Sequence, residues 1–131
     1  MDPVPDVLKA IFERGNAMQS YWSFYISVSL AMLAFFGSAQ RSRLIAIIMS
    51  LGFVGFAAIN CSALLQRAGE RHELYRLAGS EDPGAIPAKW SPLLIASEPP
   101  TPDSILKGHI AMDLSILAAI WLLTLRPREA K

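Results

Sequence analysis

One acidic side chain stands inside a long apolar stretch, and a histidine precedes it by one helical turn. Asp113 is the single charged residue between positions 108 and 125, and His109 lies four residues before it. In a helix, this spacing places the imidazole and the carboxylate on one face within hydrogen-bonding reach. A carboxylate costs about 2.5–3.5 kcal/mol at the centre of a membrane helix, so we expect it to face protein, water or a partner charge. The pair is therefore a candidate site for a proton or a cation.

The same pair also has a structural interpretation. In it, Asp113 pairs with His109 or with a loop arginine and only fixes how its helix packs. The apolar stretches contain no second charged residue, and the face of the pair continues inward with Ile116, Ile120 and Thr124, without a visible proton relay. These features favour the structural interpretation.

Other kinds of chemistry have little support in the sequence. The two histidines, His72 and His109, belong to different segments, and no Cys-x-x-Cys-His motif or Cys/His cluster accompanies them. Cys61 is the only cysteine and lies among apolar residues, where a thiol behaves as a small hydrophobic group. The sequence contains no Gly-x-Ser-x-Gly or Walker motif. We therefore expect no metal, no haem or other cofactor and no enzymatic activity, and the net charge of +1 excludes a basic nucleic-acid module.

The elements that position these residues are three long stretches almost without charge. They are residues 15–40, 44–66 and 108–125. A chain of 131 residues cannot bury three such stretches in one soluble core, but each is about long enough to cross the hydrocarbon of a bilayer. The sequence predicts an all-α integral membrane protein with a single membrane domain. The three transmembrane helices are expected at residues 20–38, 44–65 and 103–125.

The segment before the first span is predicted to be a short amphipathic helix. Residues 1–17 carry apolar residues at helical spacing, and Gly15 is placed to end the helix. We expect this helix to lie in the membrane interface, with a helix continuous with the first span as the alternative. Gly37 and Ala39 would suit signal-peptide cleavage, but the preceding segment has three acidic and two basic residues, which disfavours that interpretation.

The segments after the second span are predicted from their prolines and charges. The second helix should continue into water to about residue 79, because residues 66–79 contain no proline and many helix-forming residues. Six prolines make residues 80–102 an irregular outer loop, in which the apolar residues 90–96 should rest on the interface or on the bundle. Thr101, Pro102 and Asp103 then form an N-cap, a first-turn proline and a first-turn acid.

Orientation follows from the basic residues nearest the spans. The short loop and the tail at residues 126–131 carry five Lys or Arg against one acid, whereas the other side carries seven against nine acids over a longer stretch. We expect the N-terminus and the long loop outside and the C-terminus in the cytoplasm, in the inner (plasma) membrane of a bacterium. The expected interface anchors are Tyr21, Trp22, Trp121, Arg41, Arg43, Arg126 and Arg128.

Small and amide side chains indicate how the spans pack. Two sets of small residues each occupy one narrow sector of a predicted helix: Gly55, Ala58 and Ser62, and Ala111, Ser115 and Ala118. Small residues let membrane helices approach closely, and Asn60, on another face, should seek a hydrogen-bond partner. The two small faces either pack within the monomer or contact neighbouring proteins.

Two functions from different classes follow. The first is a non-enzymatic accessory subunit or self-assembling scaffold of a membrane complex, whose partners are lipid and either other membrane subunits or further copies of the chain. The second is an oligomeric cation or proton channel, or a pore-forming effector, that uses Asp113 with His109. The surroundings of Asp113 distinguish them, because a dry internal pairing supports the first and a water-lined carboxylate supports the second.

Overall fold

The computed structural model describes residues 4–38, 42–80 and 98–126, and its ordered elements are all helical. They are α1 (Val4–Ser38), α2 (Arg43–Ser80) and α4 (Pro102–Leu125). Within these described residues, three helices are long and apolar enough to cross a membrane. This confirms the prediction of an all-α chain with three helices of spanning length. The predicted outer loop, including residues 90–96, falls mostly outside the described residues.

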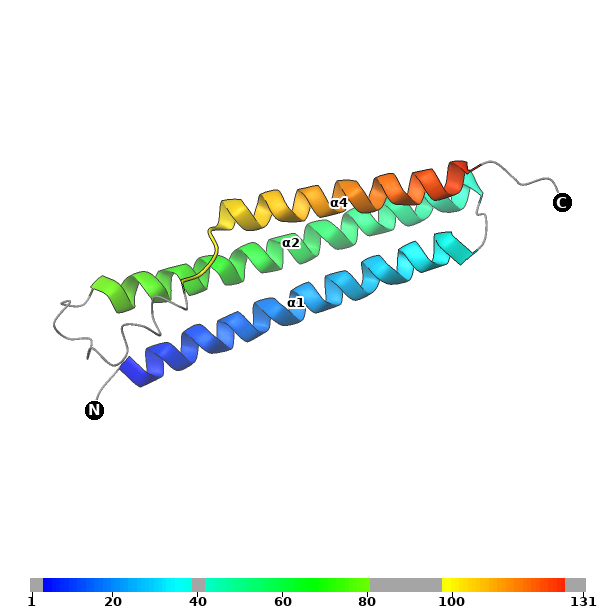
Figure 1. The fold of residues 1–131 in the computed structure, drawn as a ribbon. Helices are drawn as coiled ribbons and strands as arrows, with labels where there is room; N and C mark the ends of the chain where they lie inside the picture. Colours follow the sequence, from blue (N-terminus) through cyan, green and yellow to red (C-terminus); the bar gives the residue numbers. More distant parts are fainter. Residues whose placement is uncertain (1–3, 39–41, 81–97, 127–131) are drawn as a thin grey trace.

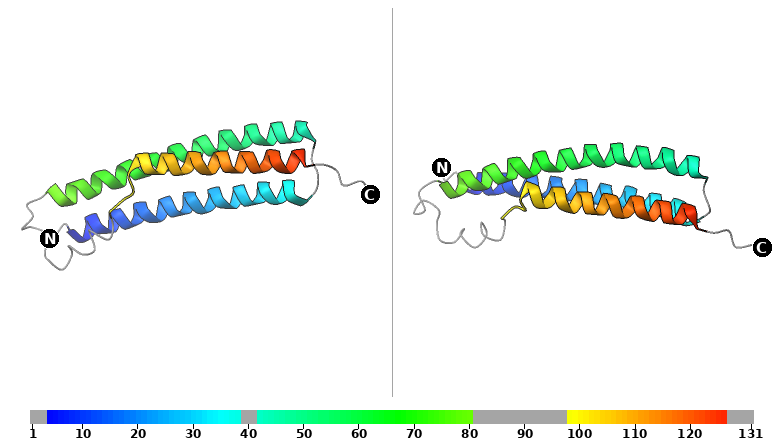
Figure 2. Two further views of the ribbon diagram at one scale, coloured as in Figure 1. Left: turned by 45° about the horizontal axis from the view of Figure 1, so that its top comes forward. Right: turned by 90° about the horizontal axis from the view of Figure 1, so that it is seen from above.

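The three helices lie side by side in one elongated bundle (Figures 1 and 2). α1 and α4 run in the same direction and α2 runs against both (Figure 1). The first part of α1 and the last part of α2 extend together beyond the start of α4 (Figures 1 and 2). One end of the bundle therefore has three helices, and the other has two.

The start of α4 is capped as its sequence predicts. The Thr101 hydroxyl accepts a hydrogen bond from the backbone N–H of Ser104 at 3.2 Å, and Pro102 follows as the first helical residue. A proline fits there because that position has no N–H partner within the helix. At the start of α2, the hydroxyl of Ser42 accepts a hydrogen bond from the backbone N–H of Ile45. Both caps satisfy N–H groups that the helix itself leaves free.

α1 is one continuous helix, so the predicted end at Gly15 is wrong, and residues 4–14 do not form a separate interfacial helix. A glycine inside a helix costs only about 1 kcal/mol, which packing can offset. Ile11 is fully buried, and Arg14 lies 3.4 Å from Glu70 of α2. A Cβ added at Gly15 would lie 3.6 Å from the Arg71 guanidinium carbon, so this part of α1 packs closely on α2.

The interior contains two apolar clusters. The central cluster is formed by Tyr25, Met32, Phe36, Ala46, Phe53, Ala57, Ile116 and Ile120. The extension cluster is formed by Met18, Leu64, Ala68 and Ile105, near the start of α4. Beyond the extension cluster, Arg67 and Arg14 both pair with Glu70, so the two-helix end carries charges typical of contact with water.

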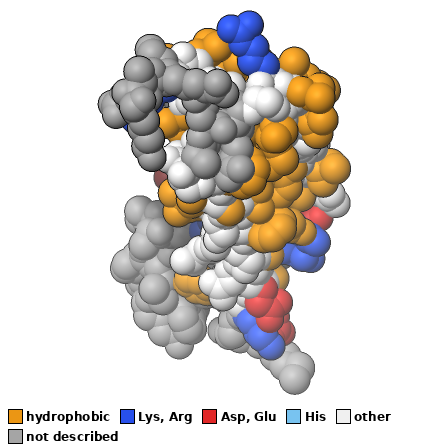
Figure 3. Space-filling model, turned by 90° about the vertical axis from the view of Figure 1, so that its right-hand side faces the viewer, with side chains coloured by type: hydrophobic (Ala, Val, Ile, Leu, Met, Phe, Trp, Pro, Cys, Tyr) orange, Lys and Arg blue, Asp and Glu red, His pale blue; other side chains and the backbone are white. Residues whose placement is uncertain are grey.

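The outside of the bundle is strongly apolar. Figure 3, which views the bundle from the end where α1 and α4 finish, shows many hydrophobic side chains on the visible surface, with charged side chains mostly at the edges of the view. The large side chains that are at least 60% exposed are Leu30, Leu44, Leu51, Ile59, Leu114 and Leu122. Such a surface suits contact with lipid, because hydrocarbon chains are as apolar as these side chains.

Candidate functional site

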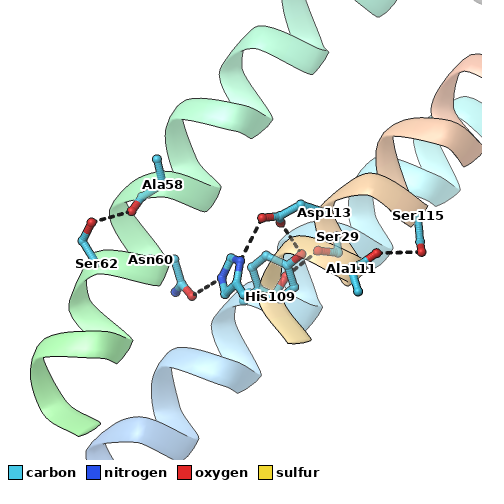
Figure 4. A network of polar contacts seen from close by, with 9 residues as sticks. Ser29, Ala58, Asn60, Ser62, His109, Ala111, Asp113 and Ser115 are labelled. Atoms are coloured by element: carbon cyan, nitrogen blue, oxygen red, sulfur yellow. Dashed lines mark hydrogen bonds and ion pairs between the residues drawn. The ribbon is translucent and has the colours of Figure 1, made fainter. Parts of the chain in front are cut away.

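Asp113 and His109 are in contact, as their spacing predicts. Asp113 is also bonded to α1, and His109 is bonded to α2. His109 Nδ1 lies 2.9 Å from Asp113 Oδ2, and the hydroxyl of Tyr25 donates to Asp113 Oδ1 at 2.6 Å. The other ring nitrogen of His109, Nε2, lies 3.3 Å from Asn60 Oδ1. Figure 4 shows Asn60, His109 and Asp113 in a row between their helices.

The network closes on the backbone of α1. Asn60 Nδ2 donates to the main-chain carbonyl of Tyr21 at 3.2 Å. Asn60 therefore bridges α1 and α4, and Tyr25 and Asp113 form a second bridge between the same two helices. We call Tyr25, Asn60, His109 and Asp113 the polar network, which links all three helices through side chains.

Matching depths bring these residues together. At a rise of 1.5 Å per residue, Tyr25 lies about 20 Å from the end of α1 and Asp113 about 18 Å from the end of α4. Asn60 and His109 likewise lie at nearly equal depths in α2 and α4. The reason is that α2 starts at the end of the bundle where α4 finishes. The polar network therefore occupies the part of the bundle nearer to the start of α4.

Aromatic rings enclose the polar network. The His109 ring is completely buried, with its centre 4.5 Å from that of Tyr25 and 5.6 Å from that of Trp22. The Tyr25 ring also stacks on Phe56 at 6.1 Å. Asn60 is buried too. Water is thus excluded from the imidazole and the amide, so their hydrogen bonds form without competition from solvent.

Asp113 is the most open member of the polar network. Its side chain is 22% exposed and borders a shallow groove of about 230 Å³ between α2 and α4. The groove is otherwise lined by Phe53, Val54, Ala57, Ala58, Cys61 and Ile110. Its lining is apolar, and both carboxylate oxygens already have partners inside the chain. The groove is therefore not a ready-made path for a hydrated ion.

The predicted small-residue faces point away from the bundle. Gly55, Ala58, Ser62, Ala111, Ser115 and Ala118 are all exposed. A Cβ added at Gly55 would meet no atom within 4 Å. Figure 4 shows the hydroxyls of Ser62 and Ser115 turned back to carbonyls of their own helices, at Ala58 and Ala111, both at 2.8 Å. In the structure, these faces therefore do not pack within the monomer, which was one of the two alternatives.

Of the predicted interface anchors, Arg43, Trp121 and Arg126 lie near helix ends, whereas Tyr21 and Trp22 lie midway along α1. Tyr21, Trp22 and Trp121 are partly buried, and Arg43 and Arg126 are exposed. Arg41 and Arg128 are outside the described residues. Trp22 also packs on the rings of Tyr25 and His109, so its role extends beyond anchoring.

Tyr25 is the member of the site that sequence reasoning missed, and the contact between Asn60 and His109 was not foreseen either. A signal for both was present, because each polar residue lies at the depth of its partner once the three spans are aligned at their common end. Tyrosine is typical of the edges of a span, so its position well inside the first span indicates a polar partner on another helix.

Within the described parts of the chain, no group of three or more His, Cys, Asp or Glu side chains is arranged to hold a metal ion. No protein-family model, curated protein or solved structure matches this chain.

Proposed function

We propose that this protein is a small, non-enzymatic membrane protein that acts as an accessory subunit or self-assembling scaffold of a membrane complex. The main support for this proposal is that the polar network lies inside the bundle while the small residues lie on its outer surface. The polar network is paired within the monomer, whereas all six small residues face outward. The polar network holds the three helices of one chain together, and the small faces remain free to pack against helices of other chains.

Physical chemistry explains why outward small faces support association. Lipid chains are as apolar as leucine side chains, so membrane helices gain little from hiding hydrophobic surface from one another. They associate through close backbone packing, which glycine, alanine and serine permit. On α2, Gly55, Ala58 and Ser62 provide such a surface between bulky exposed side chains such as Leu51 and Ile59.

We also propose that the protein lies in the bacterial inner membrane with the two-helix end outside. This orientation places the basic residues of the short loop and the tail on the cytoplasmic side, within a few residues of the hydrocarbon. The ion pairs around Glu70 would then lie on the outer side, beyond the headgroups or among them.

Adding bulk to a small face should weaken association without unfolding the bundle. In Gly55→Leu, the new side chain enters open space in the monomer, so the helical content and thermal stability of the monomer should stay the same. The oligomer or complex should dissociate at a detergent concentration at least several-fold lower than the wild type, because the backbones are held apart. Size-exclusion chromatography with light scattering in mild detergent measures this change.

Gly37→Leu is the control, since Gly37 is also an exposed glycine with nothing within 4 Å of an added Cβ, but it belongs to α1 and to neither small face. The proposal expects Gly37→Leu to assemble as the wild type does. Equal assembly of Gly55→Leu, Ser115→Leu and the wild type would show that these faces contact only lipid.

A cation or proton channel is the other proposal, and the geometry supports it less. Asp113 has two partners within its own chain, and the next buried residues towards the end of α4, Ile116 and Ile120, are apolar; the hydroxyl of Thr124, further on, donates to the carbonyl of Ile120 in its own helix. A path through one copy would therefore have to cross the dry central cluster. Liposomes containing the wild type should show no proton or cation flux above that of empty liposomes, and a flux that Asp113→Asn abolishes would favour the channel instead.

A further inference from the structure

We propose that His109 and Asp113 form a binding site for one proton, which the two side chains share and which the folded bundle requires. The proposal rests on the donors and acceptors of the polar network and is separate from the partner-binding faces. It assigns a definite protonation state to a pair that could otherwise hold zero, one or two protons.

First, the contacts of Asn60 fix the orientation of its side-chain amide. Its Nδ2 group lies 3.2 Å from the main-chain carbonyl oxygen of Tyr21. A carbonyl oxygen can only accept a hydrogen bond, so the amide nitrogen must face it. The amide oxygen Oδ1 is then the atom that faces His109 Nε2, at 3.3 Å.

The second step fixes one proton on His109. Asn60 Oδ1 is an acceptor, so Nε2 must carry a hydrogen to bond with it. The neutral tautomer with its proton on Nδ1 would place two acceptors face to face in a buried site. Nε2–H is therefore present in each state that keeps the polar network intact.

The third step concerns the contact between Nδ1 and Asp113 Oδ2, at 2.9 Å. Because Nε2 already has its hydrogen, a neutral His109 has a bare Nδ1, which faces a carboxylate oxygen. One further proton is needed between them, either on Nδ1 or on Oδ2. The Tyr25 hydroxyl does not replace it, because its hydrogen is donated to Oδ1, the other carboxylate oxygen.

Two forms of the pair satisfy all these contacts: imidazolium with carboxylate, and neutral imidazole with carboxylic acid. Both contain the same shared proton and have zero net charge. A neutral pair also suits the position of the site, because an uncompensated charge in hydrocarbon is costly. The proton therefore belongs to the pair and not to either side chain alone.

Among the residues that the structure describes, the neighbours of the pair supply no compensating charge. The titratable groups that face it are Tyr25 from α1, whose hydroxyl is a donor, and Cys61 from α2, which lines the groove beside Asp113. The nearest basic residue on α4, Lys107, pairs with Asp103 at 2.6 Å, and Arg67 of α2 pairs with Glu70. Loss of the shared proton would thus leave a partly buried negative charge on Asp113 and a broken hydrogen bond to His109.

Folding is therefore coupled to proton uptake. In the unfolded chain, histidine is neutral above about pH 6.5 and aspartate is ionised, so the two groups together hold one proton fewer than the folded pair does. When the folded state binds one proton more than the unfolded state, stability falls as the pH rises. The ratio of folded to unfolded protein should then decrease up to tenfold per pH unit above about pH 6.5.

Magnetic resonance of the full-length protein in bilayers tests the proposal directly, with the side chains of histidine and aspartate labelled. His72 is exposed and provides an internal control, the spectrum of an imidazole outside the polar network. At pH 7 to 8, His109 should keep Nε2 protonated, and the pair should be either imidazolium with carboxylate or neutral imidazole with carboxylic acid. Neutral imidazole with carboxylate, imidazolium with carboxylic acid, or a bare Nε2 would each overturn the proposal.

Asp113→Asn provides the second test. Its amide can donate to a bare Nδ1 and accept from Tyr25, so the variant should hold neutral His109 with no shared proton. Its stability should then be flat with pH where that of the wild type decreases by up to tenfold per unit. Equal pH profiles for the two proteins would overturn the proposal, and the resonance measurement on the wild type decides the matter even if this variant fails to fold.

Discussion

Replacing His109 with alanine is expected to lower the free energy of unfolding by about 3–5 kcal/mol, the range for removing a buried aromatic ring. The imidazole is fully buried between Tyr25 and Trp22, so its removal leaves a cavity that cannot collapse easily. It also leaves Asp113 Oδ2 and Asn60 Oδ1 without their partner. Unfolding in a titration of denaturing detergent, followed by circular dichroism, measures the change.

His72→Ala is the matched control for this prediction. His72 is exposed on the extension of α2, and its removal should change stability by no more than about 0.5 kcal/mol. If His109→Ala changed the free energy of unfolding as little as His72→Ala, the polar network would not stabilise the packing of the three helices.

Asn60→Leu is expected to have the second largest effect, a loss of about 2 kcal/mol. The leucine side chain is similar in size but cannot accept from His109 Nε2 or donate to the Tyr21 carbonyl. A hydrogen bond between membrane helices contributes about 0.6 kcal/mol on average and up to about 1.7, and this substitution removes two. It also leaves the Nε2–H group buried without an acceptor, which adds to the loss.

Gln66→Leu on the same helix is the control for Asn60→Leu. The Gln66 amide is exposed and bonds only weakly to Glu70, at 3.4 Å, so its loss should have little effect. The double variant Asn60→Leu with His109→Ala should lose less than the sum of the two single losses, because both remove the same contact. Fully additive losses would show that Asn60 and His109 are not coupled.

The helices could be predicted well from the sequence, because uncharged stretches of spanning length have few other structures open to them. The ends of α2 and α4 also followed from local chemistry. Helix formers continue α2 past Gln66, and Thr101 with Pro102 starts α4. The end at Gly15 was wrong because the tertiary contact of α1 with Arg71 and Glu70 outweighs the weak preference of one glycine.

Half of the polar network could be predicted, because the contact between His109 and Asp113 lies within one helix. Tyr25 and Asn60 join it through contacts between helices, which depend on the relative depth of the spans. Spacing along one helix carries no information on that depth. Aligning the spans at Ser38, Arg43 and Leu125 would have provided it.

The direction of the small faces could not be predicted either. In a soluble bundle, the polar side of a helix identifies its outer face, but lipid-facing and protein-facing sides of a membrane helix are both apolar. The sequence shows that Gly55, Ala58 and Ser62 share a sector, and only the packed bundle shows that this sector is turned outward.

Site-specific photocrosslinking in native membranes tests the central claim most directly. A photoreactive side chain at Ala58 or Ser115 should form adducts with a protein, either a second copy of the chain or another subunit. The same group at Leu30, a 60% exposed position of α1 away from the small faces, should react only with lipid. Adducts with lipid alone from all three positions would contradict the proposal that this bundle is a subunit or scaffold.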